Sequence, residues 1–516
     1  MTAVDVTPRS HDLSLRGSRT LDEWSLLALF LVVQAVAWTG LPATVFTAPP
    51  SNTVELALWA RDWFIVNYKH PGLPAWLLGF AYDVFGTHLW VSLLLAQLCI
   101  AATYVFVFML GRDLMGPGEA LLGTLLLPAV SYLTLGTLKY NHNIAQLPLW
   151  VGFILGLWRA SRSDRLPWWI FTAVFAALGL YAKFTMAMVI GLGAVWILVD
   201  GEARSRFNNR TLYIALLMFV VLLLPLAVAL GATGFGSIEW VSHESAKRGI
   251  SGLHFLRDVG ETVSTMAGAL IVSLGLNRLW QRRTVEPAPG GDRRAFVFLL
   301  LMGGGPILLT LMIALVKPAR LEWAAPMFSM IGLVLVGLVS RLRALPEGRV
   351  KAGLPHALLA LTASLCVLGI HLDSAVQHRA TGHIGRTLWP ASEIAARFDG
   401  LWQKWTGGPL QIVAGDGWTA GIVGLMSTGR PSLFTDLDLQ RSPAITESRL
   451  RRQGALVVWT EGSSWQPSQT LIAQFPHGSE SFFVGPKPRQ LTVDYLLVAP
   501  GQWTDADTEQ WLEQGD

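Results

Sequence analysis

The sequence carries little charge for its length, and this shortage excludes most soluble protein classes. Only 14% of its 516 residues are Asp, Glu, Lys or Arg, whereas a typical soluble domain has roughly 25%. Hydrophobic residues make up 52%, and the mean hydropathy is +0.45, which excludes a disordered chain. The 50 Gly and 27 Pro show no collagen-like period. An integral membrane protein remains, because mostly apolar stretches of about 20 residues recur along the chain.

Cysteine is nearly absent as well. The two cysteines, Cys99 and Cys366, both lie inside apolar runs, where a thiol behaves as a small buried hydrophobe. The sequence therefore implies neither a disulfide framework nor a zinc site. It also lacks a P-loop, an HExxH and a CxxC motif. No cluster of side chains has firm metal-ligand spacing, so no metal ligand is assigned and a divalent metal cofactor is left open.

The apolar stretches predict a mainly α, polytopic membrane protein with about eleven transmembrane helices. Three stretches in the middle are short, so ten or thirteen spans remain alternatives. The first stretch follows a polar leader and is longer than the core of a signal peptide, so we expect it to be retained. The predicted spans lie near residues 25–45, 88–110, 118–136, 144–158, 167–182, 184–199, 211–232, 259–276, 295–316, 321–340 and 354–370.

The basic residues between the spans predict their orientation. With the N-terminus in the cytoplasm, the inside segments hold roughly twice as many Lys and Arg as the outside segments, as the positive-inside rule requires. The net charge of +4 is then mainly a topology signal, and nucleic acid is not expected as a partner. We expect a multi-pass protein of the plasma membrane, which is the inner membrane in a Gram-negative bacterium.

The chain divides into two parts of different character. Residues 1–370 form the expected membrane part, and residues 371–516 an α/β domain on the outer, periplasmic or extracytoplasmic face. The second part has an amphipathic helix pattern at 391–405 and a further candidate helix at 418–427. Its strand candidates are 410–414, 456–459 and 495–498.

The first outer loop, residues 46–87, is too long to be a simple connection. The spacing of its apolar residues predicts two amphipathic helices, near 54–64 and 73–85, that lie at the membrane interface. Between them is a polar turn, 67–72, with the sequence NYKHPG, and Glu55 precedes it. A carboxylate, a cation and a tight turn at the membrane surface suit a lipid-phosphate substrate. Trp59, in the first of these helices, is either an interfacial anchor or a platform for a sugar.

Further polar residues fall on the same side of the predicted membrane. Lys139 follows the third span and is suited to bind phosphate as a point charge, while Asn141 and Asn143 beside it offer hydrogen bonds to sugar hydroxyls. Lys183 lies where the fifth and sixth spans meet, a position that makes an ionisable residue a functional candidate, unless it only extends to the interface. Arg320 lies in a short outer loop after the ninth span.

Four of these segments resemble the family 39-type glycosyltransferases of the GT-C superfamily, which include protein O-mannosyltransferases and aminoarabinose transferases. The resemblance implies a polytopic GT-C fold and a sugar donor linked to polyprenyl phosphate. It leaves a lipid, a polysaccharide or a protein as the acceptor. The segments that carry it are Asn52-Thr53-Val54-Glu55, Tyr68-Lys69-His70-Pro71-Gly72-Leu73, Lys139–Asn143 and Gly179–Phe184.

The resemblance also implies roles for single residues. Glu55 takes the place of the catalytic acidic residue of the first loop. The implied ligands of the donor phosphate are Lys69, His70, Lys139, Lys183 and Arg320, and the implied substrate contacts are Asn52, Trp59, Tyr68, Asn141 and Asn143. Two positions depart from the family pattern: the usual Asp of the first stretch is replaced by Asn52, and the second Pro of the turn by Gly72.

The sequence thus predicts a membrane glycosyltransferase that moves a sugar from a polyprenyl-phosphate donor to an acceptor on the outer face of the membrane. In this hypothesis Glu55 takes the proton of the acceptor hydroxyl. The main alternative is a transporter or flippase of a lipid-linked sugar, although no internal repeat typical of that class is visible. An inactive relative, a glycan polymerase or ligase, and a membrane scaffold are the others.

Overall fold

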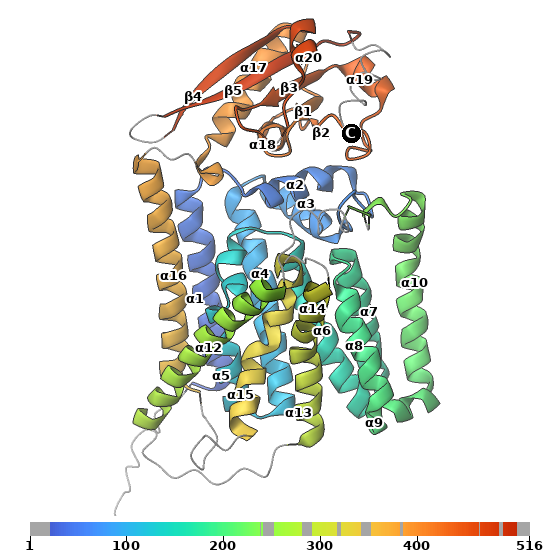
Figure 1. The fold of residues 1–516 in the computed structure, drawn as a ribbon, viewed down its shortest axis with the longest axis vertical. Coiled ribbons are helices and arrows are strands. Elements are labelled where there is room, and N and C mark those ends of the chain that lie inside the picture. The colour runs from blue at the N-terminus through green and yellow to red at the C-terminus, as the bar shows by residue number, and fades with distance from the viewer. Residues whose placement is uncertain are drawn as a thin grey trace, which may run out of the picture.

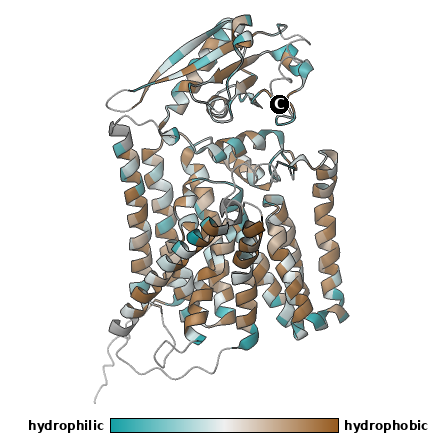
Figure 2. Ribbon diagram, viewed as in Figure 1, coloured by the Kyte–Doolittle hydropathy of each residue, from teal (hydrophilic) through white to brown (hydrophobic). Residues whose placement is uncertain are grey.

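The structure, a computed structural model, describes residues 21–237, 239–240, 252–280, 292–316, 321–341, 352–381, 385–463, 465–484 and 489–502. Long helices form a bundle, and a smaller α/β unit, residues 385–502, lies against one end of it (Figure 1). We call this the C-terminal unit. Hydrophobic residues dominate the bundle helices and hydrophilic ones gather near the helix ends (Figure 2), as in a protein that spans a membrane.

The bundle confirms the predicted polytopic helical fold. In the described part of the chain, seven helices are long and apolar enough to cross a membrane, or up to nine if each of two bent pairs is one span. Every predicted span falls on a helical segment, but the number of spans stays a prediction, because α7 (Leu166–Ala182) and α15 (Ile331–Arg341) are short. The seven are α1 (Glu23–Val45), α4 (Leu89–Leu114), α6 (His142–Ser163), α10 (Arg210–Ala232), α12 (Gly252–Trp280), the run of α13 (Arg293–Leu299), η6 (Leu300–Gly304) and α14 (Gly305–Val316), and α16 (Leu354–Thr381).

Two of the predicted spans are bent helix pairs. The first pair bends by 92° between Pro117–Ala129 and Ser131–Leu138. Pro128 lies next to this bend, and it removes one helical hydrogen bond because proline has no N–H. It consists of α5 (Pro117–Leu125), η2 (Leu127–Ala129), η3 (Ser131–Leu133) and η4 (Leu135–Leu138). The second bends by 83° between α8 (Met186–Val199) and the segment formed by α9 (Gly201–Ser205) and η5 (Arg206–Asn208).

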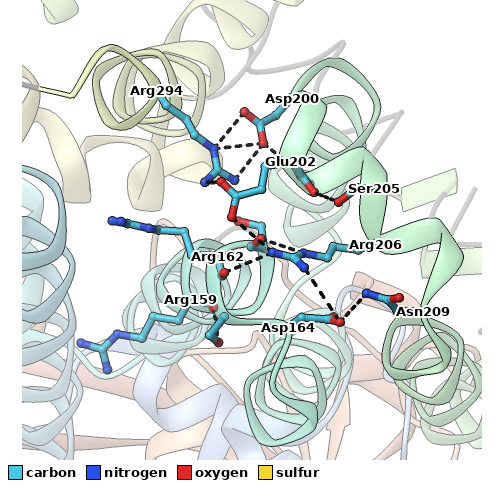
Figure 3. A network of polar contacts seen from close by, with 12 residues as sticks. Arg159, Arg162, Asp164, Asp200, Glu202, Ser205, Arg206, Asn209 and Arg294 are labelled. Carbon is cyan, nitrogen blue, oxygen red and sulfur yellow. Dashed lines mark hydrogen bonds and ion pairs between the residues drawn. The ribbon is translucent and has the colours of Figure 1, made fainter.

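Ion pairs connect the helix ends that lie far from the C-terminal unit (Figures 1 and 3). Arg294, at the start of α13, pairs with Asp200 at 2.8 Å and also with Glu202. Arg206 pairs with Glu202 at 3.2 Å and lies 4.0 Å from Asp164, which follows α6. Because these pairs are partly shielded from water and form a network, they hold α6, α9 and α13 together more firmly than isolated surface pairs would.

The first loop contains both predicted helices, α2 (Ser51–Trp59) and α3 (Leu73–Phe85). α3 keeps an exposed apolar face at Leu77, Phe80 and Val84, which is typical of an interfacial helix. α2 is instead mostly buried, because the C-terminal unit covers it. Gly421 makes this contact close: an added Cβ there would lie 2.9 Å from Val54 Cγ1.

The C-terminal unit is built on a five-stranded sheet with the order β2-β1-β3-β5-β4. β1 pairs in parallel with β2 and β3, and β5 is antiparallel to β3 and β4. The predicted helices and strands are all present, whereas β2 and β4 were not predicted, because both alternate with polar residues. The strands are β1 (Ile412–Gly415), β2 (Ser432–Thr435), β3 (Ala455–Trp459), β4 (His477–Val484) and β5 (Arg489–Val498), and the helices α17 (Ala391–Thr406), α18 (Thr419–Met426), α19 (Glu447–Gln453) and α20 (Gln469–Gln474).

Arginines fix the C-terminal unit on the first loop. Arg61, in η1 (Ala60–Asp62), donates to the carbonyl oxygens of Pro431 at 2.5 Å and Gly424 at 3.0 Å. Burial and the nearby Arg430 lower the pKa of Arg61 to about 10. Arg430 in turn pairs with Asp83 at 3.1 Å. These contacts place the C-terminal unit over the loop that carries Glu55, although α16 runs without a break through residue 371, so the domain boundary stays a prediction.

Candidate functional site

Glu55, on α2, accepts hydrogen bonds from two residues of the turn that follows. Lys69 Nζ lies 2.5 Å and Tyr68 Oη 3.2 Å from Glu55 Oε1. Among the described residues, no group donates to the second oxygen, Oε2. The side chains of Lys69 and Glu55 are 23% and 26% exposed. One carboxylate oxygen is therefore occupied, and the other is available to a substrate.

The turn is closed by backbone hydrogen bonds and has no room for a side chain at Gly72. The Asn67 N–H donates to the His70 carbonyl at 2.9 Å, and the Gly72 N–H to the Ile65 carbonyl at 2.8 Å. A Cβ added at Gly72 would lie 2.2 Å from the carbonyl oxygen of Phe64. Glycine is therefore required for space, not for its backbone angles, since its φ is −85°.

Basic side chains gather beside the turn that follows Glu55. Lys183, 5% exposed, lies at the break between α7 and α8, and its Nζ donates to Asn143 Oδ1 at 2.5 Å. The rings of His70 and His142 are 4.2 Å apart. His142 is 7% exposed, and its buried Nε2 has no hydrogen-bond partner among the described residues. Such an orphaned polar atom is typical of a site that awaits a ligand or a water.

The pKa shifts show which groups of the turn are charged. Burial, together with His142, Lys183 and Lys69, keeps the pKa of His70 well below its ordinary value of 6.5, so the ring is neutral at pH 7. Burial also opposes the charge of Lys69, but Glu55 and Tyr68 together outweigh it and raise the pKa of Lys69 above its ordinary value of 10.5. Two lysines and one carboxylate give the cluster an excess of positive charge, which suits an anion.

Aromatic rings and one arginine enclose Tyr68. Its ring centroid lies 5.6 Å from that of Trp59 and 6.4 Å from that of Trp240. Arg441, from the C-terminal unit, lies 5.9 Å from the Tyr68 ring and pairs with Asp436 at 2.7 Å. The C-terminal unit therefore forms part of the wall of the site. Across the described residues, no group of three His, Cys, Asp or Glu side chains is placed to bind a metal ion.

Known proteins resemble part of this sequence and share its architecture. A family model described as dolichyl-phosphate-mannose-protein mannosyltransferase matches residues 69–228. Crystal structures of ArnT from Cupriavidus metallidurans, apo and bound to undecaprenyl phosphate, match with TM-scores of 0.59 and 0.57. Sequence identities are 13% and 14%, and both matches cover 91% of this chain and 97% of the ArnT chain. The chain has the GT-C glycosyltransferase fold. No curated protein sequence matches it significantly.

The GT-C fold brings most of the predicted site residues together, although their roles stay predictions. Those that form one cluster around the turn are Glu55, Trp59, Tyr68, Lys69, His70, Asn143 and Lys183. Asn52 lies one helical turn before Glu55 on α2, with its side chain exposed. Its position on the same face keeps it a candidate substrate contact.

Two other predicted residues, Lys139 and Asn141, have different surroundings. Lys139 lines a separate cavity that His371 also lines. Asn141 caps α6, because its Oδ1 accepts from the Ile144 N–H at 3.1 Å, and that oxygen is therefore already engaged. Arg320 lies outside the described residues.

Several residues of the cluster around the turn were not predicted. Gln146 donates to the Lys183 carbonyl at 2.8 Å and accepts from Thr185 Oγ1 at 2.9 Å, so it fixes the break from which Lys183 extends. His142 lies between the predicted Asn141 and Asn143, so its position in the sequence could have identified it as a site residue. Arg441 gave none, because only the placement of the C-terminal unit brings it to Tyr68.

Acid should destabilise this protein through His70. Because its pKa is lowered in the folded state, the unfolded chain binds more protons below pH 6.5, and stability falls as the pH drops below that value. Above it, both states hold a neutral ring and the contribution vanishes. The loss is at most about 1.4 kcal/mol per pH unit. Thermal unfolding of wild type and His70→Gln at a series of pH values checks this: the variant should lose part of the slope, and equal slopes would contradict the prediction.

Proposed function

We propose that this protein moves a sugar from a polyprenyl-phosphate donor to an acceptor on the outer face of the plasma membrane. The observation that carries the proposal is the ion pair between the carboxylate of Glu55 and the half-buried Lys69. A second, buried lysine, Lys183, lies near His70 of the same turn. A structure of the same fold, ArnT, is described as bound to undecaprenyl phosphate, which supports a lipid phosphate as the carrier of the sugar.

The chemistry is a displacement at the anomeric carbon. Glu55 Oε2 takes the proton of the acceptor hydroxyl, and the acceptor oxygen forms a bond to the anomeric carbon. The bond between that carbon and the phosphate oxygen breaks, and the polyprenyl phosphate leaves as an anion. Lys69 and Lys183 stabilise the negative charge that develops on it, so the departure needs no general acid.

The ion pair between Glu55 and Lys69 implies an exchange of partners during the reaction. Without donor, the Lys69 ammonium is held by Glu55 Oε1 at 2.5 Å. A donor phosphate competes with that carboxylate for Lys69. Once Lys69 has moved to the phosphate, the carboxylate keeps only the longer hydrogen bond from Tyr68 on Oε1, and Oε2 is free for the acceptor hydroxyl. Donor binding thereby frees Glu55 to act as the base. Until the donor binds, the charge of Glu55 is balanced by Lys69.

The direct test is release of sugar from a panel of radiolabelled polyprenyl-phosphate sugars by the purified chain in nanodiscs. We expect release from one donor, and a loss of roughly a hundredfold in Lys183→Met, because a charge-assisted contact to the leaving phosphate is removed. Lys404→Met, at an exposed position of α17, is the matched control and should behave as wild type. Folded protein that releases sugar from no donor would contradict the proposal.

One observation favours an inactive relative as the second candidate. The family pattern has an Asp where this chain has Asn52, and the exposed Asn52 shares a helix face with Glu55. If wild type is inactive, Asn52→Asp should create sugar release in the same assay. Inactivity of both proteins would instead favour a transporter of a lipid-linked sugar or a membrane scaffold.

A further inference from the structure

Two adjoining cavities lie apart from the residues around Glu55. The first, of about 530 Å³, is lined by Lys139, His371 and Thr387 among others. The second, of about 360 Å³, lies between α5, α12 and α16 and has mostly apolar walls. Ser131 and Leu135 line both cavities. The two cavities therefore adjoin at these side chains, and together they make up a groove with one polar end.

One face of α16 follows this groove along its whole length. His356, Ala360, Ala363 and Val367 line the second cavity and His371 the first, with the spacing of three or four residues that places side chains on one helix face. The rise from His356 to His371 is about 22 Å. Half of a bilayer with its headgroup region measures about 20–22 Å. The groove thus has the length of one lipid molecule in a single leaflet.

The two ends of the groove differ in chemistry. Lys139 has no ion-pair partner, and no acidic residue lines its cavity, as far as the structure describes the chain. The opposite end is closed by His356, whose Nε2 lies 3.0 Å from the Ser273 carbonyl oxygen and whose Nδ1 accepts from the Gly353 N–H at 3.1 Å. A lysine without an acidic neighbour at the end of a transmembrane groove attracts the phosphate of an anionic lipid by its charge.

We propose that this groove binds an anionic phospholipid of the bilayer, with its phosphate on Lys139 and one acyl chain along α16. The side chains of Ala363 and Leu135 are exposed, so the groove opens sideways and a lipid can enter from the membrane. A polyprenyl chain is much longer than a groove that ends at His356, which argues against the sugar donor as the occupant.

The bound headgroup would contact both chain segments that lead toward the site. Thr387, at the entrance to the C-terminal unit, accepts at its carbonyl from the N–H groups of Thr47 at 2.9 Å and Ala48 at 3.0 Å. Pro50 also lines the first cavity and directly precedes α2. The lipid therefore stabilises the joint between the bundle and the C-terminal unit, and with it the position of α2.

Lipid binding to the purified full chain in detergent tests the proposal, with native mass spectrometry and thermal unfolding as readouts. The probes are phosphatidylglycerol, phosphatidylcholine, undecaprenyl phosphate and inorganic phosphate. We expect phosphatidylglycerol to bind at least tenfold more tightly than phosphatidylcholine and to raise the unfolding midpoint. Lys139→Gln should remove this preference, and Ala363→Trp should weaken both lipids at least tenfold by filling the groove. Ile370→Trp, at a 72% exposed position of α16, is the matched control and should bind as wild type.

Three outcomes would overturn the proposal. Unchanged phosphatidylglycerol binding in both Lys139→Gln and Ala363→Trp would show that the lipid binds elsewhere. Displacement of phosphatidylglycerol by an equal concentration of undecaprenyl phosphate would assign the groove to a polyprenyl lipid. A shift of the midpoint by inorganic phosphate alone would indicate a simple anion site. None of these readouts requires sugar transfer, so they are independent of the proposed enzymatic function.

Discussion

Replacing Glu55 with Gln should abolish sugar transfer and, at the same time, tighten binding of the donor. An amide cannot take the proton of the acceptor hydroxyl, and loss of a general base costs roughly a hundredfold to ten-thousandfold in rate. The amide also carries no charge, so Lys69 is released from the 2.5 Å ion pair and becomes available to the donor phosphate. Because that pair is partly exposed, we expect donor affinity to rise only several-fold.

Two measurements separate these effects. Single-turnover release of a radiolabelled sugar reports the chemical step, and equilibrium binding of the intact donor reports affinity. Glu393→Gln, at an exposed position of α17, makes the same chemical change away from the site and should alter neither. If Glu55→Gln loses donor binding together with transfer, the carboxylate only holds the turn in place, and the exchange of partners is wrong.

Restoring the family proline with Gly72→Pro should destroy the first-loop turn and should not raise activity. Proline has no N–H to donate to the Ile65 carbonyl, and its Cβ would meet the Phe64 carbonyl oxygen at 2.2 Å. Each defect is severe for a backbone position, and together they should cost about 3 kcal/mol or more. Gly72→Ala keeps the N–H but retains the clash, so it should be damaging to a smaller extent.

The unfolding midpoint and limited proteolysis of the loop check this prediction. Gly400→Ala is the control, since an added Cβ there meets nothing within 4 Å, and Ala at a helical position should be neutral or stabilising by up to about 1 kcal/mol. A stable Gly72→Pro protein with higher activity than wild type would show that the turn adopts the proline-containing form. Glycine at position 72 would then have lowered the activity of this chain, instead of forming the turn equally well.

The helical architecture could be predicted because the length and apolarity of a membrane span are local properties of the sequence. The pairing of Glu55 with Lys69 was also within reach, since both lie in one loop with a short turn between them. A topology prediction gives the side of the membrane on which a residue lies, but it does not give the direction in which its side chain points. Lys139 and Lys183 were predicted on the same face, yet Lys139 lines the groove along α16 and Lys183 lies among the histidines.

Contacts between the two parts of the chain could not be predicted. α2 has the pattern of an interfacial helix, but α18 covers it, and the sequence does not show which partner buries an apolar face. Arg441 reaches Tyr68 only because Arg61 and Arg430 hold the C-terminal unit in place. A separation of several hundred residues leaves no local signal for such a contact.

The hydrogen bonds of Arg61 constrain the first loop and the C-terminal unit unequally in evolution. Among the described residues, its guanidinium donates hydrogen bonds only to main-chain oxygens, those of Pro431 and Gly424, so these two bonds do not depend on side chains of the C-terminal unit. That unit can diverge in sequence, or be exchanged for another of the same backbone shape, and still be anchored. Arg61 itself has no such latitude, because a single ammonium group does not reproduce its planar fork.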